Sequence, residues 1–164
     1  MERPHLTIPT TPLDRVLEVV AIFSLIASIV LTVWHYSALP ETVESHFNLS
    51  GVPDDTGPKK LMWLLPIMAT VIYAGLTWLT RRPHALNYPV EITESNASAQ
   101  YSNAVVMIRL LKTVILGQSA SLIFFQHKVV LGHAEKLPGW WLPVTMICVL
   151  GTVVWYIVRA FRLQ

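Results

Sequence analysis

The stretch that decides the fold is Val16–Tyr36, VLEVVAIFSLIASIVLTVWHY, an almost unbroken apolar run. As a helix it would be roughly 31 Å long, which matches the hydrocarbon core of a bilayer. Glu18 lies near its start, where the positive end of a helix tolerates an anion. The run is longer than the apolar part of a usual signal peptide, and Tyr36-Ser37-Ala38 is a poor cleavage site. We therefore interpret it as a membrane span and not as a cleaved leader.

Three further apolar runs follow, and we expect them to form spans over residues 61–80, 104–128 and 140–158, after a first span over 16–36. Hydrophobic residues make up 53% of the chain and charged residues only 13%, and the latter share is about half that of a usual globular protein. The charges gather at the ends of the runs, as in membrane proteins. The sequence predicts an all-α integral membrane protein. Residues 1–164 would form a single four-helix bundle with an ordered outer loop between the first two helices.

The run at 104–128 is the least apolar of the four. We expect Arg109 and Lys112 to snorkel to the nearer membrane surface, because charged groups are costly inside a bilayer. Gln118 and Gln126 should point into the bundle for the same reason.

Three local patterns refine these expectations. Pro66, near the start of the second run, should kink that helix or delay its true start. Ser24-x-x-x-Ser28 and Gly117-x-x-x-Ser121 place small residues one turn apart, which permits close approach of neighbouring helices.

The distribution of basic residues predicts the orientation. Four spans put both termini on one side of the membrane, and that side carries eight basic residues against four on the other. The eight are Arg3, Arg15, Arg81, Arg82, Arg109, Lys112, Arg159 and Arg162, and the four are Lys59, Lys60, Lys128 and Lys136. Because cytoplasmic segments carry the excess of Lys and Arg, we expect both termini in the cytoplasm.

The segment 37–60 gathers His, Asn, Asp, Glu, Gly and Pro residues between the first two spans. His46, Asn48 and Asp54 are its best binding candidates, with Phe47 able to pin the loop to the bundle. One interpretation is a recognition surface for an external peptide or protein. The other is a loop that is fixed by its own polar contacts.

Four histidines are weak candidates for metal ligands at the outer face, where carboxylates also occur: His35, His46, His127 and His133. Imidazole and carboxylate are common zinc ligands, but no pair has helical spacing, so a site would need both outer loops to converge. No motif for catalysis, phosphate binding or dinucleotide binding is present, so we expect no cofactor and a non-enzymatic protein. The single Cys148 excludes an intrachain disulfide, and the absence of a basic stripe argues against nucleic-acid binding.

Two motifs carry a family resemblance. Leu39-Pro40…Val43…His46-Phe47-Asn48…Gly51-x-Pro53-Asp54 resembles the signature of a bacterial membrane domain of unknown function, found at the N-terminus of SdpI-like immunity proteins. Asn87-Tyr88-Pro89-Val90…Asn96…Gln100-Tyr101 resembles a second motif of those proteins. The resemblance implies a multi-pass protein of the bacterial inner membrane. In the longer relatives it implies protection against a secreted toxin and sequestration of a transcriptional repressor.

The resemblance adds Tyr88, Asn96 and Tyr101 as binding candidates for a cytoplasmic partner. Three functions remain open on the sequence. The first is a non-enzymatic binding or regulatory membrane protein. The second is an accessory subunit that buries Gln118 and Gln126 against other membrane subunits. The third is a metal-dependent carrier or enzyme that uses the outer histidines.

Overall fold

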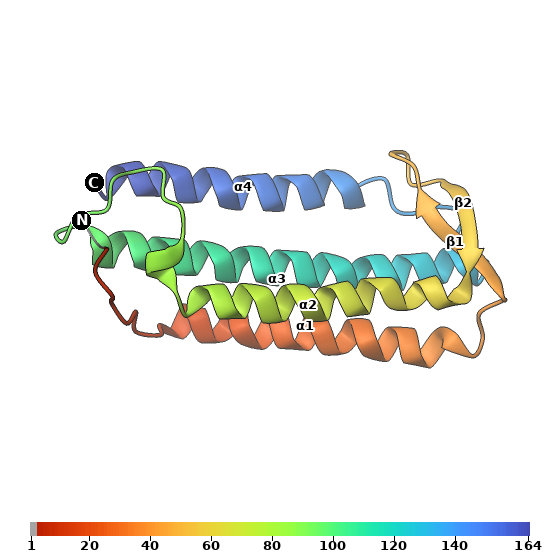
Figure 1. Cartoon of the computed structure of the whole chain (residues 1–164). Coiled ribbons are helices and arrows are strands. Elements are labelled where there is room, and N and C mark those ends of the chain that lie inside the picture. Colours follow the sequence, from red (N-terminus) through yellow and green to blue (C-terminus); the bar gives the residue numbers. More distant parts are fainter. Residues whose placement is uncertain (1–2) are drawn as a thin grey trace.

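A computed structural model describes residues 3–164, and long helices account for most of them (Figure 1). The helices are α1 (Pro12–Tyr36), α2 (Leu64–Thr80), α3 (Ala97–Val130) and α4 (Trp141–Arg162). Within these residues, four helical stretches are long and apolar enough to cross a membrane; the second includes the short 3₁₀ helix η1 (Lys59–Trp63) that precedes α2. The expectation of four apolar helices is confirmed, and they support a membrane protein.

The expectation of an all-α chain is wrong in one respect. The connection between α1 and α2 contains an antiparallel hairpin of β1 (Thr42–Phe47) and β2 (Pro53–Pro58). Figure 1 shows this hairpin at one end of the bundle, and both ends of the described chain at the other. We call these the hairpin end and the terminal end. A short 3₁₀ helix, η2 (Pro83–Ala85), lies in the connection between α2 and α3.

The helix starts follow from local sequence. The Thr11 side chain caps α1, and Asp14 accepts hydrogen bonds in return from the Thr11 backbone N–H and hydroxyl. This capping box satisfies donors that a helix N-terminus leaves free, and Pro12 at the first helical position has no N–H to satisfy. Pro66 lies in the first turn of α2, so the proline delays the α-helix until Leu64, as expected.

Helix α3 is the centre of the bundle and contacts α1, α2 and α4, whereas α4 packs chiefly against α3. Asp14 of α1 pairs with Arg109, and His35 stacks on His127. On the other side of α3, Gln100 donates to the carbonyl of Ala160.

Helices α1 and α4 are therefore displaced along α3, as Figure 1 shows. Trp141, the first residue of α4, donates to Ser121. The contact residues of α1 and α4 on α3 are nine positions apart at the terminal end (Arg109 and Gln100) and six apart at the hairpin end (His127 and Ser121), which corresponds to about 9–13 Å of helix. Each end of α3 thus extends past one of its neighbours.

Small residues line the contact between α1 and α3. Ala21, Ser24, Ser28 and Thr32 are buried along one face of α1, and a Cβ atom on Gly117 would lie 3.8 Å from Ser24 Oγ. The close approach that the small-residue patterns predicted is confirmed for this pair of helices. Ala21, Ala69 of α2 and the fully buried Leu116 of α3 form the central apolar cluster.

Two buried amides fasten α4 to α3. Gln100 donates to Ala160 O at 2.8 Å and Asn103 donates to Tyr156 O at 3.1 Å. Replacing either amide by leucine should lower stability by at most about 1 kcal/mol, the size measured for hydrogen bonds between membrane helices, because the change also removes a buried amide oxygen that has no partner within residues 3–164. Thermal unfolding in detergent micelles checks this. Ser102→Ala is the matched control, because the exposed Ser102 hydroxyl bonds only within its own helix.

Candidate functional site

The hairpin is anchored to the bundle by apolar residues. Val43 of β1 is 1% exposed, and it forms a buried cluster with Leu39 and Met62 against Val130 of α3. Gln126 of α3 donates to the carbonyl of Glu44 at 3.0 Å. These contacts hold one strand of the hairpin across the ends of α2 and α3.

The three binding candidates of the hairpin contact the hairpin itself. His46 Nδ1 lies 2.6 Å from Asp54 Oδ1, so this predicted pair is brought together, with both side chains largely exposed. Asn48 Oδ1 accepts the backbone N–H groups of Ser50 and Val52, which closes the turn between the strands. These bonds match the structural interpretation of the loop, and they leave the outer edges of His46 and Asn48 open to solvent.

Gly51 fastens the turn to the connection between α3 and α4. Its φ of +77° is in the left-handed region, and its carbonyl accepts the N–H of Leu137 at 2.9 Å. A Cβ atom at this position would lie 2.9 Å from the Leu137 carbonyl oxygen. The two connections at the hairpin end therefore form one unit, and glycine is required at the contact.

A cavity of about 360 Å³ lies beneath this unit. Its walls come from the hairpin turn, the starts of α2 and α4, and the part of α3 that extends past α4. Leucine side chains, Met62 and Trp141 make most of the wall, and His46, Asn48 and Gln126 add polar groups. Leu49 also lines the cavity and is 89% exposed at the tip of the turn. Such a cavity suits an apolar group that carries a polar end.

The candidate metal ligands do not converge. In the described chain, residues 3–164, no three His, Cys, Asp or Glu side chains are placed to hold one metal ion. His35 and His127 stack at 4.8 Å between ring centroids, His46 faces Asp54, and His133 is exposed in the last connection.

His127 is 2% exposed, and neither ring nitrogen has a hydrogen-bond partner within residues 3–164. Replacing it by phenylalanine should leave stability unchanged or raise it, because an unsatisfied buried polar group is removed while the stacked ring is kept. Thermal unfolding of the variant, with His35→Phe alongside, measures this. A loss above about 1 kcal/mol would mean that the imidazole has a partner.

The second motif forms the connection at the terminal end. The Tyr88 and Tyr101 rings lie 5.6 Å apart, and the Tyr88 hydroxyl donates to Pro83 O. Burial raises the pKa of Tyr88, so this donor stays protonated at physiological pH. Asn96 holds the turn before α3 through Thr93 and Glu91. Tyr101 is fully buried, so of the three candidates only Tyr88 and Asn96 reach the surface.

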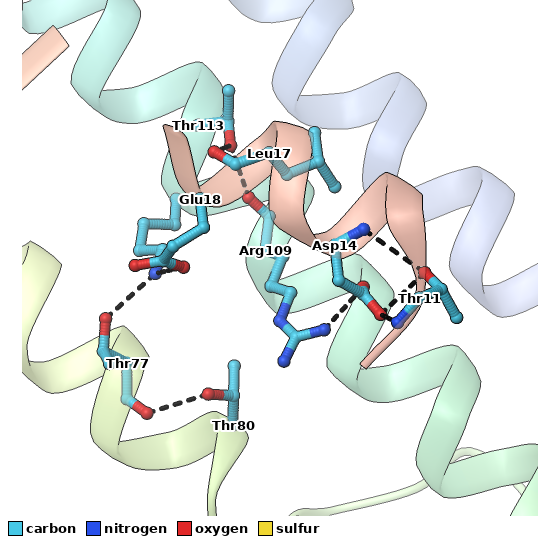
Figure 2. Close-up of polar contacts among 9 residues, drawn as sticks. Thr11, Asp14, Leu17, Glu18, Thr77, Thr80, Arg109 and Thr113 are labelled. Atoms are coloured by element: carbon cyan, nitrogen blue, oxygen red, sulfur yellow. Dashed lines mark hydrogen bonds and ion pairs between the residues drawn. The ribbon is translucent and has the colours of Figure 1, made fainter. Parts of the chain in front are cut away.

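A cluster of charges joins α1, α2 and α3 near the terminal end (Figure 2). Arg109 Nη1 lies 2.6 Å from Asp14 Oδ1, and Lys112 Nζ lies 2.6 Å from Glu18 Oε2. Lys112 also donates to Thr77 Oγ1 at 2.9 Å, and the Tyr73 hydroxyl donates to Glu18 at 2.7 Å. Each of these four charges inside the bundle therefore has an opposite charge beside it.

This cluster corrects the expectation that Lys112 would snorkel to the membrane surface. Its side chain is 1% exposed and is held by Glu18, because a partner inside the bundle replaces the solvation that a surface would supply. Glu18, Arg109 and Lys112 each stand out in the sequence, but the pairing between them was missed there. The available signal was the presence of opposite charges near the same end of two apolar runs.

Residues 23–70 match the family model "Domain of unknown function (DUF1648)", a segment that covers the second half of α1, the whole hairpin and the start of α2. No curated protein and no solved structure matches the chain. The match supports an uncharacterised domain at this position. With the four apolar helices, it is consistent with a multi-pass membrane protein.

Proposed function

We propose that the protein is a non-enzymatic, multi-pass protein of the bacterial cell membrane, and that its hairpin end binds an external peptide or protein. The observation that carries the proposal is the apolar cavity of about 360 Å³ beneath the hairpin turn. An apolar side chain of the ligand would enter the cavity. His46 and Asn48 would then meet its polar backbone, since both side chains are exposed at the rim.

The orientation rests on the basic residues. Arg109 and Lys112 form ion pairs inside the bundle. They are therefore not counted when the basic residues at the two ends are compared. The terminal end still carries six arginines against four lysines at the hairpin end. The excess supports a cytoplasmic terminal end and an external hairpin end.

The resemblance to SdpI-like immunity proteins suggests the class of ligand. Those relatives protect against a secreted toxin, and a secreted peptide would meet the membrane from the hairpin end. A contact with a cytoplasmic partner would involve the exposed turn around Asn96 and the edge of Tyr88, because Tyr101 is buried.

An accessory-subunit function has less support. It was suggested by Gln118 and Gln126, whose amides would need partners on other subunits. Gln126 donates to the carbonyl of Glu44 within the chain. This internal bond removes the reason to expect another subunit beside Gln126.

Photo-crosslinking from the hairpin tip tests the proposal. A benzoylphenylalanine placed at Leu49 in living cells should give a discrete adduct with an external peptide or protein. Leu122→Trp fills the cavity from α3 without changing the hairpin, and it should abolish that adduct.

The matched control places the same crosslinker at Glu135, which is exposed at the hairpin end but does not line the cavity. It should give no such adduct. The proposal fails if Leu49 gives no adduct, if Glu135 gives the same one, or if Leu122→Trp leaves the adduct unchanged while the protein is inserted normally.

A further inference from the structure

A second cavity lies at the terminal end, between the start of α1 and the end of α2. It has a volume of about 780 Å³. Asp14, Arg15 and Glu18 of α1 line one side, and Tyr73, Thr77 and Arg81 line the other. The segment before α1 covers its end. The cavity is distinct from the one beneath the hairpin, and the proposed function does not use it.

The charges around this cavity do not cancel. Asp14 is paired with Arg109, and Glu18 is paired with Lys112, so both acidic residues are already neutralised. Arg15 and Arg81 are exposed, and their side chains make no ion pair or hydrogen bond within residues 3–164. Two guanidinium groups are therefore available to an anion, and the positive N-terminal end of α1 adds to their potential.

The cavity continues onto an apolar surface. Val19 and Ile22 also line it, and they are 66% and 39% exposed. Arg15, Val19 and Ile22 are spaced i, i+4 and i+7, so they lie on one face of α1, with the cation at the helix start. Ile26 and Val33 are exposed further along the helix. In a bilayer spanned by α1, the cationic end of this surface would lie at the level of the lipid headgroups and its apolar remainder at the level of the acyl chains.

We propose that this cavity binds one anionic phospholipid. The lipid phosphate would lie between the Arg15 and Arg81 guanidinium groups, which suit bidentate hydrogen bonds to phosphate oxygens. The Thr77 hydroxyl accepts from Lys112, and its own hydrogen can be donated to the headgroup. One acyl chain runs along α1 over Val19 and Ile22. Basic pockets between membrane helices on the cytoplasmic side are typical sites for anionic headgroups.

Native mass spectrometry of the full chain tests the proposal. Detergent-purified protein is titrated with phosphatidylglycerol or with phosphatidylcholine of the same chain length. We expect one phosphatidylglycerol per chain, held at least about tenfold more tightly than phosphatidylcholine. The double variant Arg15→Gln/Arg81→Gln should reduce its affinity to that of phosphatidylcholine.

The matched control is Arg82→Gln/Arg159→Gln. It removes the same charge at the same end, from arginines that stack on Trp78 and Trp155 and do not line the cavity. It should leave phosphatidylglycerol binding unchanged. Equal losses in both double variants would mean a general surface-charge effect and would overturn the proposal, as would equal binding of the two lipids.

Two further measurements identify the ligand's source and protect against a folding artefact. Ile22→Trp should weaken phosphatidylglycerol binding without removing a cation, because it obstructs the acyl path. Millimolar inorganic phosphate should not displace the lipid. Displacement by phosphate, or an unaffected Ile22→Trp variant, would make this a phosphate site and overturn the lipid assignment. Unfolding temperatures establish that each variant compared is folded.

Discussion

Replacing Glu18 by alanine is expected to destabilise the protein by about 3 kcal/mol, the lower end of the range for breaking a buried ion pair. The Lys112 side chain is 1% exposed and would be left with no carboxylate beside it. The lower end applies because Glu18 itself is about one-third exposed. The Tyr73 hydroxyl would lose its acceptor in the same change. Reversible unfolding in detergent micelles, or thermal unfolding where it is irreversible, measures the loss.

The double variant Glu18→Leu/Lys112→Leu separates pairing from polarity. Replacing both members of a buried pair by apolar residues of similar size is often neutral or stabilising, so it should recover most of the loss. Glu41→Gln is the surface control, because Lys59 and Glu41 form an exposed pair and exposed pairs contribute little. A Glu18→Ala variant as stable as Glu41→Gln would show that Lys112 is not held by Glu18.

The helices could be predicted from sequence because the membrane imposes their length. A run of about 20 apolar residues, such as that after Val16, has few alternatives to a helix in a bilayer. The delayed start of α2 could also be predicted from the sequence around Pro66, since the proline ring excludes a regular α-helix just before it.

The hairpin and the charge pairs could not be predicted in the same way. Residues 53–58 hold two prolines, two aspartates and a glycine, which have low strand propensity. They form β2 because Val43 and Leu39 anchor the preceding strand to the bundle.

The Glu18–Lys112 pair joins residues far apart in the chain, and only the packing of α1 on α3 brings them together. The binding candidates in the hairpin could be identified from the sequence because polar residues concentrate there. The cavity beneath the hairpin could not be predicted from the sequence, since its wall comes from four separate elements.

Replacing Gly51 by alanine should release the hairpin turn from the connection between α3 and α4. Two effects add at this position. The left-handed φ of +77° costs roughly 1 kcal/mol for any residue with a Cβ atom, and that Cβ atom would lie 2.9 Å from the Leu137 carbonyl oxygen. The chain can relieve the clash only by moving the turn, which breaks the Leu137–Gly51 hydrogen bond. Hydrogen exchange should therefore accelerate over residues 42–58 and at Leu137, with little change in α1 or α3.

Two other glycines separate the causes of this effect. Gly132 has a φ of +73°, but no atom lies within 4 Å of the position that a Cβ atom would occupy, so Gly132→Ala tests backbone strain alone. Gly139 has neither a positive φ nor a close neighbour, so Gly139→Ala should change nothing. If the contact with Leu137 matters, exchange in the hairpin rises for Gly51→Ala only. Equal exchange in Gly51→Ala and Gly132→Ala would mean that strain, not the contact, governs the turn.

The cavity beneath the hairpin should lose its shape with the turn, so Gly51→Ala is also expected to abolish the crosslink from Leu49, whereas Gly139→Ala preserves it.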